Sequence, residues 1–285
     1  MRLVRGLIWL TGASTGIGKS TAILLAKNRW KVAVSARNAA SLKRLEESSN
    51  SIYAYPMDVS DPVMRKEVYN KIRRDHGPID ILINNAGYGM RGAVEEMELS
   101  ELRDLFDVNV FAPLALSKLV LPEMRQRRAG RIIMISSVVG RVAFPLSGAY
   151  SASKFALEGF GDALRAELMP WNVKVILVEP GPIATQFGEV AKSASTSKFR
   201  DNDSPYARYY KRIMEKGYFK RSSYWGSKVV AESIQNACQN PNPRTRYPVH
   251  TSSVYLPWLS RLLPTKIFDR LMNRVPGLNQ PAPMS

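Results

Sequence analysis

Near its N-terminus the chain carries the apolar run Leu7-Ile8-Trp9-Leu10, followed at once by the turn Thr11-Gly12-Ala13-Ser14-Thr15-Gly16-Ile17-Gly18. A short apolar run beside a turn predicts a buried strand, and the residues after the turn suit a helix. A strand, a glycine-rich turn and a helix in this order predict the first unit of a parallel α/β sheet.

Apolar, β-branched runs then alternate with longer amphipathic segments through the first two thirds of the chain. This alternation is typical of a parallel sheet covered by helices. We therefore predict an α/β, single-domain Rossmann fold, with a doubly wound, mostly parallel sheet and helices on both faces. The predicted strands are residues 7–10, 31–35, 52–56, 79–83, 130–135 and 174–178.

The formal net charge is +17, from 41 Lys and Arg against 24 Asp and Glu. Such an excess favours an anionic partner, which could be a nucleic acid, a membrane surface or a small ligand. Nucleic acid is disfavoured, because the basic residues do not form one tract with interleaved aromatic residues. Arg125, Arg127, Arg128 and Arg131 cluster around Ala129-Gly130, where we expect a solvated helix-to-strand turn.

The single cysteine, Cys238, cannot form an intramolecular disulfide, and no Cys/His cluster predicts a metal site. Arg2 and Arg5 precede the first apolar run, but we interpret that run as a strand rather than a cleaved signal segment. No run reaches the roughly 18 apolar residues that a membrane-spanning helix needs. We therefore expect a cytoplasmic protein.

The glycine-rich turn also predicts a ligand. Glycines let the backbone approach a pyrophosphate closely, and the N-terminus of the following helix directs N–H groups at that anion. We expect a dinucleotide to bind there, against Gly12, Ser14, Thr15, Gly16, Ile17 and Gly18.

The second predicted strand ends at Ala36-Arg37. An acidic residue at this place would bind both hydroxyls of an adenosine ribose and repel a 2′-phosphate. A guanidinium suits a phosphate instead, because its donors form a fork and its charge persists. The sequence therefore favours NADP(H) over NAD(H), with a solvent-facing arginine as the alternative.

The small residues Asn84-Asn85-Ala86-Gly87 follow the apolar run at 81–83. Their size would let a cofactor pass close above the sheet. Alone, this segment would be an ordinary turn.

The segment Tyr150-Ser151-Ala152-Ser153-Lys154 places a tyrosine and a lysine four residues apart, so both project from one helix face. A neighbouring cation stabilises a phenolate, and we expect Lys154 to move the pKa of Tyr150 from near 10 toward working pH. Tyr150 would then exchange a proton with an alcohol or carbonyl oxygen. Ser137, thirteen residues earlier, could hydrogen-bond the same oxygen. A structural Tyr/Lys stripe is the alternative.

Together these motifs resemble the short-chain dehydrogenase/reductase family, in order, from about residue 7 to residue 187. The shared positions are the glycine motif at 11–18, Asp58, residues 84–87, Asn109, Ser137, Tyr150, Lys154 and Pro180-Gly181.

The resemblance implies further roles. Asn109 would complete a catalytic tetrad with Ser137, Tyr150 and Lys154, by holding a water that links the lysine to solvent. Lys154 would also bind the nicotinamide ribose. Family members usually form dimers or tetramers through the helices that follow Asn109 and Tyr150. Asp58 would bind the adenine amino group, Asn85 would lie near the adenine ribose, and the backbone from Pro180 through Ile183 with Thr185 would hold the carboxamide. The further implied cofactor contacts are Val59, Ala86 and Gly87, beside Gly181 and Ile183 of that backbone.

Within the family, residues 153–160, 164–168 and 178–182 resemble the branch of retinol and 17β-hydroxysteroid dehydrogenases. That branch implies a large apolar alcohol or ketone, such as a steroid, retinoid or lipid. The likeness does not extend to residues 186–227, where we expect an irregular loop at 189–204 and short helices at 206–224. This segment could form a lid over the site, with a surface insertion as the alternative.

We divide the chain into a dinucleotide-binding and catalytic core at 1–185, a substrate-loop region with the final core elements at 186–240, and a C-terminal extension at 241–285. Residues 227–240 predict a further helix. Residues 265–274 predict a basic amphipathic helix, with Leu263, Ile267 and Leu271 on one face and Lys266, Arg270 and Arg274 on another. This helix could lie in a membrane interface, pack on the domain or cap a dimer.

Two other functions remain open at this point. A protein that senses NADP(H) could keep the fold without catalysis, although it would not require Asn109, Ser137, Tyr150 and Lys154 together. A nucleic-acid-binding protein would follow from the charge alone, and its binding would be strongly salt-dependent.

Overall fold

The computed structural model describes residues 6–184, 203–216 and 224–279. Within them, the chain forms a seven-stranded sheet in the order β3-β2-β1-β4-β5-β6-β9, and all neighbouring strands are parallel. The crossover between β1 and β4 is the switch point of a doubly wound sheet, so the predicted Rossmann fold is confirmed. The strands are β1 (Leu7–Thr11), β2 (Lys31–Ser35), β3 (Ile52–Ala54), β4 (Ile79–Asn84), β5 (Gly130–Ile135), β6 (Val173–Glu179) and β9 (Arg246–Pro248).

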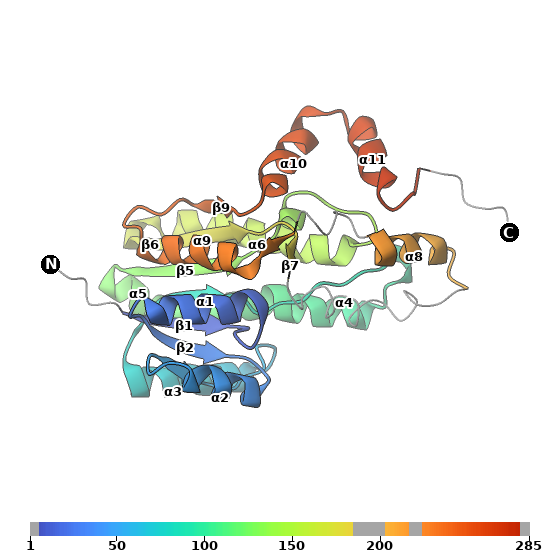
Figure 1. Cartoon of the computed structure of the whole chain (residues 1–285). Coiled ribbons are helices and arrows are strands. Elements are labelled where there is room, and N and C mark those ends of the chain that lie inside the picture. Colours follow the sequence, from blue (N-terminus) through green and yellow to red (C-terminus); the bar gives the residue numbers. More distant parts are fainter. Residues whose placement is uncertain (1–5, 185–202, 217–223, 280–285) are drawn as a thin grey trace.

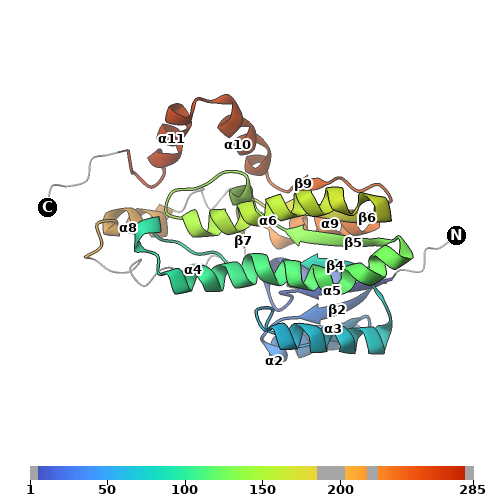
Figure 2. The same ribbon diagram turned by 180° about the vertical axis from the view of Figure 1, so that it is seen from behind.

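Helices cover both faces of this sheet (Figures 1 and 2). One face carries α1 (Gly16–Lys27), α2 (Ala39–Glu47) and α9 (Ser227–Gln239), with Leu25, Leu42 and Ile234 fully buried against the strands. The other face carries α3 (Pro62–His76), α5 (Ala112–Arg127) and α6 (Gly148–Glu167). Because both faces are covered, the central strands are continuously apolar: all five residues of β1 are buried.

The seventh strand, β9, was not predicted. Its three residues pair with Leu177, Val178 and Glu179 of β6. The assignment of all of 241–285 to an extension was therefore wrong for residues 246–248, which belong to the sheet. Such a short strand carries no apolar run, and its pairing with β6 depends on tertiary structure.

The basic turn between α5 and β5 is more ordered than expected. Arg128 adopts a left-handed conformation (φ 51°) and ends α5. Arg127 pairs with Asp80 at 2.7 Å, and the half-buried Arg131 donates to the Ala237 carbonyl at 2.6 Å. The turn itself is solvent-exposed at residues 125–129, as predicted, and its arginines additionally hold neighbouring elements together.

A continuous helical stretch, Leu99–Arg127, comprises α4 (Leu99–Phe106), a π-helical turn at Asp107–Phe111, and α5. By length and composition it could cross a membrane. Leu116, Val120 and Met124 are nevertheless buried in the layer between α5 and the sheet. The stretch is therefore a core helix of this fold.

The remaining described elements surround the carboxyl ends of the strands. They are a two-stranded parallel pair, β7 (Ile183–Ala184) and β8 (Trp225–Gly226), helix α8 (Ala207–Lys216), and the helical hairpin α10 (Thr251–Leu262) and α11 (Thr265–Arg274). The predicted helix at 265–274 is confirmed. Of the predicted lid, α8 is a helix, while residues 185–202 and 217–223 lie outside the described part of the chain.

The packed face of α11 differs from the predicted apolar face. Phe268 and Met272 pack against the core, whereas Ile267 and Leu271 remain exposed. Both pairs are apolar at helical spacing, so the sequence pattern could not show which pair would be covered.

Candidate active site

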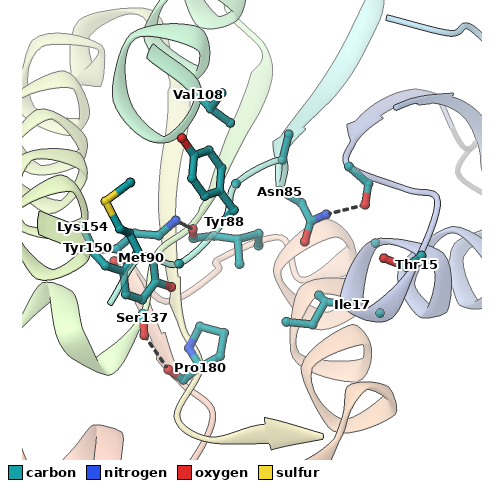
Figure 3. Close-up of a pocket in the computed structure, with 18 of the residues that line it drawn as sticks. Thr15, Ile17, Asn85, Tyr88, Met90, Val108, Ser137, Tyr150, Lys154 and Pro180 are labelled. Atoms are coloured by element: carbon teal, nitrogen blue, oxygen red, sulfur yellow. Dashed lines mark hydrogen bonds between the residues drawn. The ribbon is translucent and has the colours of Figure 1, made fainter. Parts of the chain in front are cut away.

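A cavity of about 1030 Å³ lies at the carboxyl ends of the strands, over the switch point between β1 and β4. Ligands of open α/β sheets bind at this place, because the loops leaving neighbouring strands diverge there. Figure 3 shows the residues that line it, with Thr15 and Ile17 at one end and Ser137, Tyr150 and Pro180 at the other. The cavity therefore connects the glycine-rich turn with the predicted catalytic group.

The glycine-rich turn packs closely, backbone to backbone, against the segment that follows β4 and against its own helix start. Gly12 has a positive φ of 68°, and a Cβ on it would lie 2.8 Å from the Ala86 Cα. A Cβ on Gly18 would collide with the Gly12 carbonyl. The Asn85 amide donates to the carbonyls of Thr11 (2.9 Å) and Gly12 (3.0 Å), so it fixes the shape of the turn.

The end of β2 presents Arg37 beside Asp58. Arg37 is exposed at the edge of the cavity. Burial acts to raise the pKa of the Asp58 carboxyl, but hydrogen bonds from Ser60, together with the charges of Arg37 and Arg65, hold that pKa below its usual range. An ionised carboxylate and a guanidinium thus stand next to each other where an adenosine would bind.

Helix α6 and the turn after β5 bring the catalytic candidates together. Ser137 and Tyr150 hydrogen-bond through their hydroxyls, and the Ser137 hydroxyl also contacts the Pro180 carbonyl at 3.3 Å (Figure 3). Lys154, one turn beyond Tyr150, is buried at 5% exposure and donates to the Ile135 carbonyl at 2.9 Å. The predicted group is therefore assembled at one end of the cavity.

The pKa values within this group differ from expectation. We expected Lys154 to lower the pKa of Tyr150, but burial raises that pKa above its usual range, while the Ser137 hydrogen bond lowers it only in part. Burial acts on Lys154 as well: it lowers the pKa of the ammonium to about 8, opposed by the charge of Glu158. Tyr150 therefore keeps its proton more firmly than an exposed tyrosine does, and Lys154 keeps its proton less firmly than an exposed lysine does.

Asn109 lies behind the cavity wall and does not line it. Its amide donates to the Tyr88 carbonyl (2.9 Å) and to Ser153 (3.1 Å), and its oxygen accepts from the Tyr88 N–H (3.0 Å). A Cβ on Gly87 would lie 2.9 Å from this oxygen and 3.6 Å from the Lys154 Nζ. Asn109 and Lys154 therefore approach each other across Gly87. Asn109 itself belongs to the π-helical turn Asp107–Phe111, and such turns are often found at functional sites.

A charged cluster continues from Lys154 along α6. Glu158 pairs with Arg246 of β9 at 3.0 Å, and Asp162 pairs with the same guanidinium at 2.7 Å. Arg246 also pairs with the buried Glu179 at 3.0 Å, as does Arg141 at 2.9 Å. The unpredicted strand β9 thus supplies the cation that holds buried carboxylates below the site.

The family model for short chain dehydrogenases matches residues 7–195. The chain belongs to the short-chain dehydrogenase/reductase family. It is 34% identical to a probable short-chain type dehydrogenase/reductase VdlC of Helicobacter pylori, over 93% of this chain and 96% of that protein. It is also 35% identical to human retinol dehydrogenase 8, over 72% of this chain and 68% of that protein.

A solved short-chain dehydrogenase from Streptomyces avermitilis has the same fold, with a TM-score of 0.79 and 28% identity, over 98% of this chain and 97% of that one. Members of the short-chain dehydrogenase/reductase family use a nicotinamide cofactor. The described residues fit such a group, because one cavity joins the glycine-rich turn at the N-terminus of α1 to Tyr150 and Lys154.

Nearly all the residues predicted for this family site line the cavity. Exceptions are Asn109, behind the wall, and Thr185, which lies outside the described residues. The lining residues listed next were not predicted, since no local motif marks them and several come from loops between elements: Ala36, Asn38, Met57, Ser60, Tyr88, Gly89, Met90, Arg91, Asp104, Asp107, Val108, Ile135, Ser136, Val138, Val139, Phe144, Ser147 and Tyr224.

Proposed function

We propose that this chain is an NADP(H)-dependent oxidoreductase that interconverts a carbonyl and a primary or secondary alcohol on an apolar substrate, with Tyr150 as the acid/base. The hydrogen-bonded hydroxyls of Tyr150 and Ser137, facing the cavity one turn from a buried lysine, carry this proposal. Two hydroxyls in this arrangement can both hydrogen-bond the same substrate oxygen.

In the reductive direction, the Ser137 hydroxyl donates a hydrogen bond to the substrate carbonyl and orients it. NADPH, when bound, would supply the hydride for the carbonyl carbon. Tyr150 gives its proton to the oxygen as the negative charge develops, so an alcohol forms. Tyr150 is suited to this, because its raised pKa keeps the phenol protonated until that oxygen becomes more basic.

The proton must then return to Tyr150. Lys154 is the proposed donor, because its pKa of about 8 lets it give up a proton near neutral pH. Asn109, close to Lys154 across Gly87, is proposed to hold the water that connects the lysine to solvent. The alcohol-oxidising direction uses the same groups in reverse.

The preference for NADP(H) rests on Arg37 at the end of β2. The residues beside it, Ala36 and Asn38, carry no charge that would repel a 2′-phosphate. Asp58 stands on the neighbouring loop, where we assign it with Val59 to the adenine. The other assigned cofactor contacts are Gly12, Ser14, Thr15, Gly16, Ile17, Gly18, Asn85, Ala86, Gly87, Pro180, Gly181, Ile183 and Thr185.

The apolar substrate is supported by the lining near Tyr150. Met90, Val139 and Phe144 line the cavity there, and Met90 stands beside Tyr150 in Figure 3. A relative named retinol dehydrogenase 8 points in the same direction, since retinol is a large apolar alcohol. We further propose a cytoplasmic homodimer or homotetramer that contacts membranes peripherally through its C-terminal helix.

The direct test is a screen of apolar ketones and aldehydes with NADPH and NADH in parallel, following cofactor oxidation. We expect turnover of at least one apolar carbonyl, with a higher kcat/KM for NADPH. Binding of NADPH without turnover of any carbonyl or alcohol would instead favour a cofactor-sensing protein. A higher kcat/KM for NADH would refute the role of Arg37.

A further inference from the structure

The hairpin of α10 and α11 carries a concentration of exposed apolar side chains. It stands clear of the sheet and its helical layers in both views of the molecule (Figures 1 and 2). Among the described residues, seventeen large apolar side chains are exposed, and seven of them fall within residues 254–275. These seven are Val254, Tyr255, Trp258, Leu262, Ile267, Leu271 and Val275.

The exposed positions follow the helical repeat. Val254, Trp258 and Leu262 recur every fourth residue of α10, at 49%, 64% and 73% exposure. Ile267 and Leu271 form the equivalent stripe on α11. Each helix thus has a second apolar face, besides the one that packs on the protein, and an amphipathic helix with such a face is suited to a membrane interface.

The hairpin is also basic. Arg261, Lys266, Arg270 and Arg274 are exposed, against a single exposed carboxylate in the same segment, Asp269. On α11 the basic residues recur every fourth position beside the apolar stripe. In a symmetric contact between two copies the same patch would face itself and bring like charges together, whereas anionic lipid headgroups would neutralise them.

The inner face of the hairpin touches the wall of the active-site cavity. Leu256 of α10 and Met272 of α11 form one buried cluster with Val138, Val142 and Phe144. Val138 and Phe144 also line the cavity. A surface that binds the outer face of the hairpin would therefore lie on the side of the cavity that Val138 and Phe144 line.

We propose that the outer face of the α10–α11 hairpin docks on anionic membrane surfaces, so that the enzyme takes its apolar substrate from the lipid phase. The docking follows from the exposed Trp258 and Leu262 with their basic neighbours. The delivery of substrate additionally rests on the proposed function. The partner is a bilayer that carries anionic phospholipid.

The test is co-sedimentation of the full chain with vesicles of phosphatidylcholine, with or without phosphatidylglycerol. We expect the protein to bind the anionic vesicles, to leave them at high salt, and to bind neutral vesicles weakly. The double variant Trp258→Glu/Leu262→Glu should lower the partition coefficient by about tenfold or more, because it places charge in the lipid-facing stripe. Arg270→Glu should weaken binding to anionic vesicles alone.

The matched control is Val63→Glu, which introduces the same charge at a position 63% exposed on α3, away from the hairpin (Figure 1). It should bind vesicles as the unaltered chain does. Thermal unfolding of every variant checks that the fold is kept. Equal binding by the double variant, or no binding by the unaltered chain, overturns the proposal. The proposal is also overturned if the unaltered chain does not bind vesicles and the double variant has a lower oligomer mass. That result would show that the outer face of the hairpin is a contact between copies.

Activity measurements separate this inference from the proposed function. The double variant should turn over a water-soluble carbonyl at the unaltered rate, but should lose turnover of a carbonyl embedded in anionic vesicles. If the unaltered chain binds vesicles yet reduces no carbonyl, the proposed function fails while the docking surface stands. If it reduces carbonyls in solution and ignores vesicles, the docking proposal fails alone.

Discussion

At the scale of single residues, the site depends on side chains whose charge is costly to bury. Lys154 is 5% exposed and carries an ammonium whose pKa burial lowers to about 8. Glu158 opposes this shift from one turn further along α6. The lysine is therefore poised to exchange a proton near neutral pH, which suits a group that reprotonates Tyr150.

The opposition between burial and Glu158 predicts a pH effect. Glu158→Gln removes a negative charge that favours the ammonium, so the pKa of Lys154 should fall further. We expect the decline of reductive kcat/KM at alkaline pH to move to lower pH. The Glu158 side chain faces Arg246 of β9 and Glu179 of β6. Asp162→Asn, one turn farther from Lys154, is the control and should move the profile less. An unchanged or raised apparent pKa in Glu158→Gln would contradict this account.

Arg37 gives a second prediction at this scale. Arg37→Ser should raise KM for NADPH by about tenfold to hundredfold, since a hydrogen-bonded charge pair is lost, and leave KM for NADH nearly unchanged. Steady-state kinetics with both cofactors measures this difference. Arg44→Ser, at an exposed arginine of the adjacent α2, should change neither KM. A parallel rise of KM for both cofactors would show a general loss of binding instead.

Sequence alone located nearly all these residues but not their detailed surroundings. The order of Ser137, Tyr150 and Lys154 was enough to expect one cluster, because the first follows a strand and the others share a helix face. It could not show that burial would raise the Tyr150 pKa, nor that the Asn85 amide would hold the turn at Gly12. Both depend on contacts between segments far apart in the chain.

At the scale of elements, two segments late in the chain brace the elements that surround the site. Helix α8 is tied to the turn after β4: the Tyr210 hydroxyl accepts from the Ala93 N–H at 2.8 Å and donates to Glu96, and the Ser204 hydroxyl donates to Glu96 at 2.6 Å. Strand β9 is the edge strand next to β6, and its Arg246 pairs with Glu158 of α6. Both lie after the segments that the family motifs cover.

Arg246 should therefore matter for stability. Arg246→Met would leave the buried carboxylates of Glu158 and Glu179 without this partner, and we expect a loss of about 3–5 kcal/mol in the free energy of unfolding. Denaturant titration measures the loss. Arg165→Met breaks the more exposed pair with Asp162 and should cost about 1 kcal/mol or less. Equal effects of the two changes would refute a special role for the Arg246 cluster.

Elements with a strong local pattern were predicted well, and elements without one were not. Strands 31–35 and 130–135 and the helix at 265–274 were predicted with their observed bounds, because their apolar spacing is clear. Strand β9, Arg-Tyr-Pro in sequence, shows no such spacing. The sequence also could not show which face of α11 would pack, since Phe268 and Met272 have the same helical spacing as Ile267 and Leu271.

At the scale of the whole molecule, α4, α5 and α6 lie together on one side (Figure 2), and apolar side chains remain exposed on them. Phe111, in the turn before α5, is 54% exposed, and Phe155 and Phe160 of α6 are 45% and 44% exposed. Small residues, Ala152 and Gly159, lie exposed beside them. Such a surface is suited to association between copies.

We expect this layer to be the contact between subunits. Light scattering after size exclusion should give at least twice the 31.9 kDa chain mass for the unaltered protein. Phe155→Glu/Phe160→Glu should shift the mass toward that of one chain, because charge would enter an apolar contact. Trp258→Glu/Leu262→Glu changes the α10–α11 hairpin instead of this layer, so that variant should keep the mass of the unaltered protein. A monomeric unaltered protein would contradict the expectation.

The central claim is that Tyr150 transfers the proton that accompanies hydride transfer, and Tyr150→Phe tests it most directly. The variant removes one hydroxyl and leaves the aromatic ring in place. With the carbonyl found in the substrate screen, kcat/KM should fall by about a hundredfold to ten-thousandfold, while the Kd for NADPH stays within a few-fold of its original value. Turnover by Tyr150→Phe at the unaltered rate, with NADPH bound equally well, would contradict the account.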